Sequence, residues 1–258
     1  MTVKIKTDLL VIGAGAGGLS VAAGAAQLGI KVVLLEGDKM GGDCLNYGCV
    51  PSKALIAFSN QRKPKQFNDA MGFVRDAINE IEPHDSEERF RSLGVNVIRE
   101  YGQFVNETTV AAGAYEIQSR RIVIATGVHT PVPDISGLSD VQYYTNQTIF
   151  DLTKEPKNLL VLGGGPVGVE LAQAFARLGV NVTIFEKRKL LSNFSREHVE
   201  ILRVSLVEDG VSLKEDTCVN NISKVGGKLV VQLTNDDKIT GSHLLVATGK
   251  KPNLQNLN

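Results

Sequence analysis

Two stretches of the chain repeat one pattern of apolar and polar positions. In residues 8–38 and in residues 158–188, an apolar run leads into a glycine-rich turn, a longer segment ending at Leu-Gly, and a second apolar run that closes on a glutamate. A short apolar run bounded by glycines is typical of a strand buried on both faces of a parallel sheet, and the longer segment has helical length. The pattern predicts a strand–helix–strand unit that occurs twice, with helices ending near Gly29 and Gly179.

A second pair of apolar runs follows these units. Residues 120–133 and 242–253 each contain a strand pattern that ends on Ala-Thr-Gly, which predicts a closing strand for each unit. Residues 79–98 indicate a helix and then a strand, and residues 102–119 alternate as short antiparallel strands with turn signals. We predict an α/β fold with two Rossmann-like βαβ domains, each with a small antiparallel sheet, in three layers. The polar, proline-containing segment 131–156 favours domains of residues 1–145 and 146–258.

Both glycine-rich turns contain G-x-G-x-x-G, and a glutamate stands eighteen residues beyond the last glycine of each. The first glycine permits a tight turn, the second lets backbone approach a pyrophosphate, and the third lets helix and strand pack closely. The helix N-terminus adds free N–H groups and a positive dipole end. One such turn is weak support for a nucleotide, but two matched copies indicate two dinucleotide sites. Their residues are Gly13, Gly15, Gly18 and Glu36, and Gly163, Gly165, Gly168 and Glu186.

The glutamates bear on which dinucleotide each unit would bind. A carboxylate at the end of the second strand can accept hydrogen bonds from a ribose hydroxyl pair. Glu186 therefore favours NADH, because the 2′-phosphate of NADPH would meet a negative charge. Lys187, Arg188 and Lys189 follow at once and could still favour a phosphate, or could form a solvated turn, so NADPH stays possible.

Composition narrows the class of partner. The chain has 258 residues, 43% of them hydrophobic, with 28 basic and 28 acidic residues and a formal net charge of zero. This balance gives no electrostatic reason to expect a nucleic acid or an anionic membrane, so small molecules are the expected ligands. No apolar run is long enough to span a membrane, and the N-terminus lacks a signal-peptide layout. We expect a soluble, cytoplasmic protein.

Cys44 and Cys49 stand five positions apart in the sequence MGGDCLNYGCVPSKAL. They could be a redox pair, half of a metal site, or two unrelated buried thiols. A structural zinc site needs four ligands, but there is no second cysteine pair and the four histidines are scattered, so no metal site is predicted. Pro51 suits the first turn of a helix, whose dipole would stabilise a nearby thiolate. Cys218 stands alone and is interpreted as structural.

The order of the segments GAGAGG, GGDCLNYGCVPSK, IVIATG, GGGPVGVE and LLVATGKKPN resembles the class I pyridine nucleotide-disulfide oxidoreductases, which include dihydrolipoamide dehydrogenase, glutathione reductase and mercuric reductase. The resemblance covers nearly the whole chain, and GGDCLNYGCVPSK is its most specific part. It implies FAD in the first βαβ unit and the nicotinamide nucleotide in the second, with hydride passing to the flavin and on to a disulfide.

The resemblance also assigns roles to individual residues. It implies that Cys49 is the thiol nearest the flavin and that Cys44 exchanges with substrate, and the helix-end setting is expected to favour the thiolates that exchange requires. Lys53 matches a lysine near the flavin and Glu170 its ion-pair partner, although both could be ordinary surface charges. The expected catalytic residues are Cys44, Cys49, Lys53 and Glu170. The expected cofactor-binding residues are the two glycine and glutamate sets given above with Gly42, Lys53, Ala125, Thr126, Gly127 and Gly249.

The sequence departs from this family in length. Members are usually much longer, and the resemblance implies that a dimerisation domain and a histidine–glutamate acid–base pair lie beyond Asn258. We therefore expect a homodimeric parent protein acting on a small-molecule disulfide, dithiol or metal ion, and a truncated chain with little activity alone. Two alternatives stay open, namely an NADH oxidase or diaphorase, and a non-catalytic dinucleotide-binding fragment.

Overall fold

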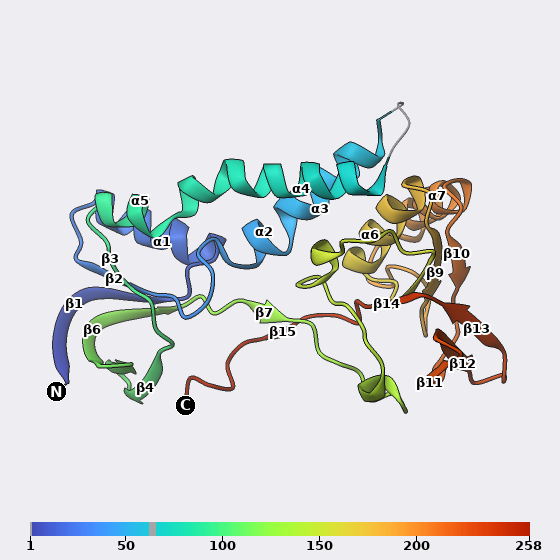
Figure 1. Cartoon of the computed structure of the whole chain (residues 1–258). Helices are drawn as coiled ribbons and strands as arrows, with labels where there is room; N and C mark the ends of the chain where they lie inside the picture. Colours follow the sequence, from blue (N-terminus) through green and yellow to red (C-terminus); the bar gives the residue numbers. More distant parts are fainter. Residues whose placement is uncertain (1, 62–65) are drawn as a thin grey trace. The chain divides into compact units, whose positions relative to one another are not determined.

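The computed structural model describes residues 2–61 and 66–258 (Figure 1). The chain forms two compact units. The first consists of Met1–Val50, Asp76–His129 and Lys251–Asn258, and the second of Pro51–Arg75 and Thr130–Lys250. Two of the divisions fall inside the helices α3 (Cys49–Ser59) and α4 (Phe67–Ile81). The units thus differ from the division between residues 145 and 146, which rests on the polar, proline-containing segment 131–156 and stays a prediction.

The first unit contains a six-stranded sheet in the order β3-β2-β1-β6-β5-β4. Neighbours from β3 to β6 pair in parallel, whereas β5 and β4 are antiparallel additions. The predicted α/β architecture is confirmed, although the antiparallel strands here extend the parallel sheet because β6 is long enough to pair with β1 and β5 at once. The strands are β1 (Val3–Ile12), β2 (Val32–Leu35), β3 (Asn96–Ile98), β4 (Gln103–Asn106), β5 (Thr109–Ala112) and β6 (Tyr115–Ile124).

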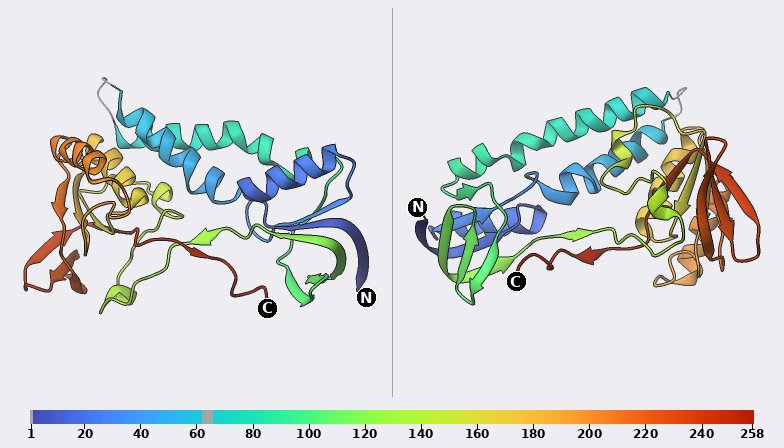
Figure 2. Two further views of the ribbon diagram at one scale, coloured as in Figure 1. Left: turned by 180° about the vertical axis from the view of Figure 1, so that it is seen from behind. Right: turned by 60° about the horizontal axis from the view of Figure 1, so that its bottom comes forward.

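Both faces of this sheet are covered. Leu10, Ile12 and Leu35 belong to one buried cluster, whereas Val11 and Leu34 belong to another on the opposite face. This alternation explains the continuous apolar runs, because each successive side chain enters a different core. Helices α1 (Ala16–Gln27) and α5 (Glu87–Ser92) lie on one face (Figures 1 and 2). The first unit also contains α2 (Gly42–Asn46), η1 (Glu82–Asp85), and a two-stranded sheet of β7 (Val128–His129) and β15 (Lys251–Pro252).

The second unit repeats the βαβ pattern and separates its two sheets. A four-stranded parallel sheet has the order β10-β9-β8-β14, and a three-stranded antiparallel sheet has the order β11-β12-β13. Their facing side chains share one buried cluster, which includes Leu160 and Val246 from the parallel sheet and Val231 from the antiparallel one. The strands are β8 (Asn158–Leu162), β9 (Asn181–Phe185), β10 (Ser212–Lys214), β11 (Val219–Val225), β12 (Lys228–Leu233), β13 (Lys238–Gly241) and β14 (His243–Val246).

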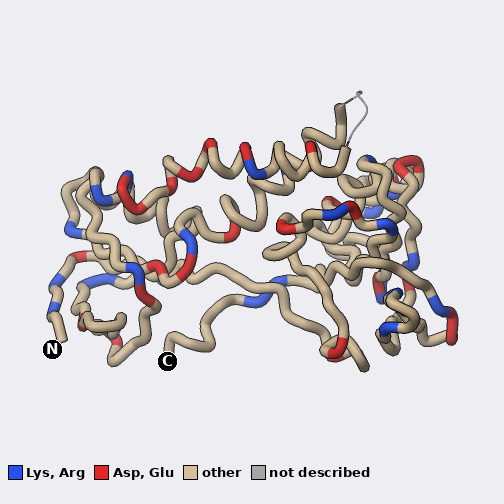
Figure 3. Tube along the Cα trace, in the orientation of Figure 1, with Lys and Arg blue, Asp and Glu red and all other residues tan. Residues whose placement is uncertain are grey.

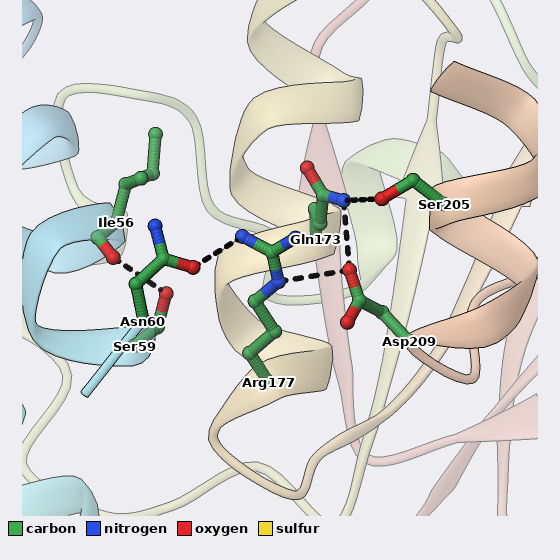
Figure 4. A network of polar contacts seen from close by, with 7 residues as sticks. All are labelled: Ile56, Ser59, Asn60, Gln173, Arg177, Ser205 and Asp209. Atoms are coloured by element: carbon green, nitrogen blue, oxygen red, sulfur yellow. Dashed lines mark hydrogen bonds and ion pairs between the residues drawn. The ribbon is translucent and has the colours of Figure 1, made fainter. Parts of the chain in front are cut away.

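Helices complete the second unit. Helix α6 (Pro166–Arg177) follows the glycine turn, and α7 (Arg196–Glu208) lies beside it, with the short helices η2 (Leu138–Asp140) and η3 (Ile149–Asp151) preceding β8. Arg177 and Gln173 of α6 both donate to Asp209 Oδ2, at 2.8 and 2.7 Å, and Arg177 also donates to Asn60 at 2.5 Å (Figure 4). These bonds join α3, α6 and the end of α7.

Basic and acidic residues are interspersed over most of the chain. Residues 76–88 are the exception, since they carry six acidic residues and neither lysine nor arginine (Figure 3). Within residues 2–61 and 66–258, every helix is too short or too polar to cross a bilayer.

Candidate functional site

The first glycine turn is built by close backbone approaches. Gly13 has φ +104, a conformation that side chains rarely adopt, and a Cβ atom there would lie 2.3 Å from the carbonyl oxygen of Ala125. A Cβ at Gly18 would lie 1.8 Å from the carbonyl oxygen of Gly13. The first and third glycines are therefore required by the packing of helix, strand and the Ala-Thr-Gly turn, whose Ala125 N–H donates to Ile12 O at 2.8 Å.

The second glycine turn has the same geometry. Gly163 has φ +107, and a Cβ there would lie 2.4 Å from Ala247 O, while a Cβ at Gly168 would lie 2.1 Å from Gly163 O. The turns that close each unit also match, since Gly127 and Gly249 both have positive φ. The closing turn of the first unit is further fixed by Asn253, whose side chain donates to Thr126 O at 2.9 Å and whose N–H donates to Gly127 O at 3.0 Å.

The middle glycine of each turn has a different explanation. A Cβ at Gly165 would meet no atom of the described residues within 4 Å, and a Cβ at Gly15 would meet only Gly42 Cα, at an ordinary 3.8 Å. Both residues are helix N-caps with extended backbone, and glycine has no side chain that could cap the first N–H groups of the helix. Nothing in the fold of either turn requires glycine at this position. The open space beside first-turn N–H groups fits a pyrophosphate.

Each glutamate carboxylate accepts a hydrogen bond from a backbone N–H of its own glycine turn. Glu36 accepts hydrogen bonds from the N–H groups of Ala14 and Asp38, both at 2.7 Å. Glu186 accepts from Gly164 N–H at 2.7 Å and from Arg188 N–H at 3.0 Å. A carboxylate oxygen has two lone pairs, so each glutamate can still accept from ribose hydroxyls.

The segment that carries the cysteines contacts the first glycine turn. Gly42 has φ +57, and a Cβ there would lie 2.6 Å from Gly15 Cα. The neighbouring Gly41 N–H donates to Ala14 O at 2.9 Å. Because α2 begins at Gly42, Cys44 lies on the helix whose first residue contacts the glycine turn, two residues further along. The approach also explains why glycine precedes the cysteine pair.

Cys44 and Cys49 interact as two free thiols. Cys44 is half-buried on α2, and Cys49 is exposed at the first residue of α3. Burial raises the pKa of the Cys44 thiol to about 11, and a hydrogen bond to Cys49 and the negative charge of Asp85 act in the same direction. The expectation that the helix-end setting favours a thiolate at both positions is therefore wrong for Cys44 in the dithiol state, because desolvation disfavours its charged form.

Asp85 is a site residue that sequence reasoning missed. It lies on η1, and its Oδ2 atom would be 3.1 Å from a Cβ placed at Gly41. Burial raises the pKa of the Asp85 carboxyl, against the lowering effect of His84 and Arg89. Asp85 lies far from Cys44 along the chain, so no local pattern could have connected the two.

Lys53 and Glu170 form an ion pair between α3 and α6 in the second unit. The buried Ser52 hydroxyl also donates to Glu170 Oε1, at 3.1 Å. The Lys53 side chain is 65% exposed and that of Glu170 23% exposed. The structure thus brings the two expected partners together and adds a hydroxyl that the sequence did not indicate.

Two further expectations concern residues outside this site. Cys218 is an exposed free thiol directly before β11, rather than part of either buried core. Within the described part of the chain, histidine, cysteine and acidic side chains do not gather in any group of three or more that could hold a metal ion.

Comparisons with known proteins all indicate the same family. The family described as pyridine nucleotide-disulphide oxidoreductase matches residues 7–258. The chain is 32% identical to a mercuric reductase of Lysinibacillus sphaericus, covering 97% of this chain and 50% of that protein. It is 29% identical to a dihydrolipoyl dehydrogenase of Staphylococcus aureus, covering 98% of this chain and 58% of that protein.

Solved structures agree with these sequence relatives. The HOCl-induced flavoprotein disulfide reductase RclA from Escherichia coli superposes with a TM-score of 0.90 at 29% identity, over 97% of this chain and 58% of that chain. The chain therefore spans about half the length of the relatives it matches.

Proposed function

The chain belongs to the pyridine nucleotide-disulphide oxidoreductase family, and from this we propose that it is the dinucleotide-binding and thiol-bearing part of an FAD-dependent NAD(P)H disulfide oxidoreductase. The observation that carries the proposal is the pair of free thiols, Cys44 and Cys49, on the segment held beside the first glycine turn by the approach of Gly42 to Gly15. Two matched glycine turns with an interacting thiol pair beside one of them fit electron transfer between two dinucleotides and a disulfide better than either feature alone.

The two glycine turns hold the cofactors in this proposal. Gly13, Gly15, Gly18 and Glu36 hold FAD, and the corresponding set around Gly165 and Glu186 holds the nicotinamide nucleotide, with the Ala-Thr-Gly turns packed against each. When bound, FAD supplies the two-electron chemistry that connects the nicotinamide with the Cys44–Cys49 disulfide. The chain supplies uncapped helix N-termini for the phosphates and carboxylates for the ribose hydroxyls.

The thiol pair performs the exchange with substrate. The Cys44 thiolate attacks one sulfur of a substrate disulfide, releases one substrate thiolate, and leaves a mixed disulfide. The Cys49 thiolate then attacks the Cys44 sulfur, releases the second substrate thiolate, and closes the Cys44–Cys49 disulfide. One substrate disulfide is reduced and two protein thiols are oxidised, so the electrons balance.

The raised pKa of Cys44 slows its attack on the substrate disulfide. With a pKa of about 11, the Cys44 thiol must give up its proton to a base before it can attack. We therefore expect the 258 residues alone to turn over disulfides slowly. The same observation favours a second candidate function, an NADH oxidase or diaphorase in which the thiols matter little.

NADH is the proposed electron donor. The Glu186 carboxylate is fixed by two backbone N–H groups at the position where a 2′-phosphate would lie. Among the basic residues that follow, Lys189 forms an ion pair with Asp216, which reduces the positive charge it can offer to a phosphate. A fixed carboxylate and a neutralised lysine both disfavour NADPH.

Electron counting tests the proposal. The purified chain is loaded with FAD and titrated anaerobically with dithionite, with flavin absorbance as the readout. Wild type should take up four electrons per bound flavin, two for the flavin and two for the disulfide, whereas Cys44→Ser should take up two. Cys218→Ser is the matched control, because this exposed thiol lies outside the site, and should take up four.

Each other outcome is informative. A wild-type uptake of two electrons would contradict a redox-active disulfide and favour the oxidase or diaphorase. Failure of the chain to bind FAD would contradict the assignment of the first glycine turn in these 258 residues. Disulfide exchange also predicts that a small-molecule disulfide or a thiol-binding metal ion accepts the electrons, and comparing both as acceptors in steady-state assays would identify the substrate class.

A further inference from the structure

The turn that follows Glu186 is held by a buried carboxylate, Glu215. This residue follows β10, and its Oε1 atom accepts a hydrogen bond from Leu190 N–H at 2.7 Å. Its Oε2 atom pairs with Arg203 of α7. The Glu215 side chain is only 9% exposed. Burying a carboxylate is costly unless its oxygens are satisfied, so Glu215 is committed to these two partners.

Leu190 connects Glu215 to the second glycine turn. Its side chain is 1% exposed, and a Cβ added at Gly164 would lie 2.5 Å from Leu190 Cδ2. The next residue, Leu191, donates its N–H to Gly164 O at 3.0 Å. The N–H of Gly164 in turn donates to Glu186 Oε2. A displacement of Leu190 would therefore move Gly164, whose N–H orients the Glu186 carboxylate.

The first βαβ unit carries a counterpart at the same position. Glu36 N–H donates to Ile98 O, and Glu186 N–H donates to Lys214 O, so Arg99 corresponds to Glu215. The Arg99 guanidinium donates to Asp38 O, in the turn after Glu36. In both units, the charged residue that follows the third strand of the βαβ pattern forms a hydrogen bond to the turn after the glutamate. Arg99 is the donor in the first unit, and Glu215 is the acceptor in the second.

We propose that Glu215, oriented by Arg203, is a positioning residue for the part of the second site that binds the adenosine ribose of the nicotinamide nucleotide. The inference rests on the proposed function, because it requires Glu186 to receive the ribose hydroxyls. Glu215 touches no ligand in this proposal. It acts through Leu190 and Gly164, which hold the Glu186 carboxylate at the end of β9.

Calorimetric titration of the full chain with ADP-ribose tests the inference, because this ligand carries the adenosine ribose and pyrophosphate without the nicotinamide. We expect Glu215→Ala to raise the Kd by about tenfold, since losing one well-placed hydrogen bond to a charged carboxylate changes a Kd by about tenfold or more. Glu200→Gln is the matched control. It removes the other carboxylate near Arg203, which is 3.3 Å away and 66% exposed, and should leave the Kd unchanged.

A double-mutant cycle separates positioning from general stability. If Glu215 acts through Glu186, then Glu215→Ala should cause no further loss of ADP-ribose affinity in a Glu186→Gln background. An equal loss in both backgrounds, or an unchanged Kd for folded Glu215→Ala, would overturn the inference. If Glu215→Ala does not fold, the Kd of Glu215→Gln tests the inference instead. This variant keeps an acceptor for Leu190 N–H but loses the charge that pairs with Arg203. We expect its Kd to rise about threefold, since a neutral hydrogen bond is about half as strong as a charge-assisted one, and an unchanged Kd would be contrary to the inference.

If the proposed function is wrong, the titration gives a different result from the one expected if only the role of Glu215 is wrong. In that case the wild-type chain would not bind ADP-ribose, before any variant is compared, and the positioning role would fall with it.

Discussion

Replacing Gly165 with alanine separates nucleotide binding from folding in the second glycine turn. Gly165 is the N-cap of α6 with φ −79 and ψ 179, an extended conformation that any residue adopts. A Cβ there would meet no atom of the described residues within 4 Å. We therefore expect Gly165→Ala to lower the free energy of unfolding by no more than about 1 kcal/mol, which is the cost of alanine as a poorer N-cap than glycine.

The affinity for NADH should respond differently. A methyl group at Gly165 would occupy the space through which the backbone approaches the pyrophosphate. Because the pyrophosphate would lose hydrogen bonds from the helix N-terminus, each contributing about 1.5 kcal/mol or more to a charged group, we expect the Kd for NADH to rise at least tenfold, about 1.4 kcal/mol. The matched control is Gly168→Ala, whose Cβ would lie 2.1 Å from Gly163 O. There α6 must move away from β8, and overpacking of this kind costs about 3 kcal/mol of unfolding free energy.

Two measurements check this contrast. Urea denaturation gives the free energy of unfolding for each variant, and fluorescence titration gives the Kd for NADH. A folded Gly165→Ala variant that binds NADH with the wild-type Kd would refute the placement of the pyrophosphate beside Gly165. A loss of stability as large as that of Gly168→Ala would show that the space around Gly165 is not open.

Three further predictions follow from the described contacts. Cys44, with a pKa of about 11, should be alkylated slowly by iodoacetamide at pH 8 and faster as pH rises toward 11, followed by mass spectrometry; the rate of an ordinary thiol at pH 8 would contradict this. Asp85→Asn should raise that rate at fixed pH, because it removes a negative charge that raises the Cys44 pKa, and a slower rate would be evidence against the contact. Asp209→Ala should lower the free energy of unfolding by about 2 kcal/mol, because Arg177 and Gln173 lose a shared acceptor, and an unchanged urea midpoint would mean that the network in Figure 4 contributes nothing.

Much of the fold was predictable because its signals are local. Apolar runs bounded by glycines predicted the strands β1, β2, β8 and β9, since a strand buried on both faces needs an apolar residue at every position. The Leu-Gly ends of α1 and α6 were also predictable, because Gly29 and Gly179 have positive φ values that favour glycine. What the runs could not show was that β5 and β4 join the parallel sheet in one unit while β11, β12 and β13 stand apart in the other.

Some residues of the candidate site were also predictable from local sequence, and others were not. The glycine and glutamate residues were found from their spacing, since one turn and one strand fix their relation. The pairing of Lys53 with Glu170 came only from the family resemblance, because the two residues lie on separate helices. Asp85 and Glu215 were not found, since each acts on a residue that the chain reaches only after folding.

The sequence by itself determined where the chain turns and which residue types stand at each turn, because a positive φ or a close backbone approach restricts a position to glycine whatever surrounds it. Only the tertiary structure decided the state of Cys44, whose pKa depends on burial and on Cys49 and Asp85 rather than on its place in the motif. Desolvation and charge act through space, and the distances that set them exist only once α2, α3 and η1 have packed together.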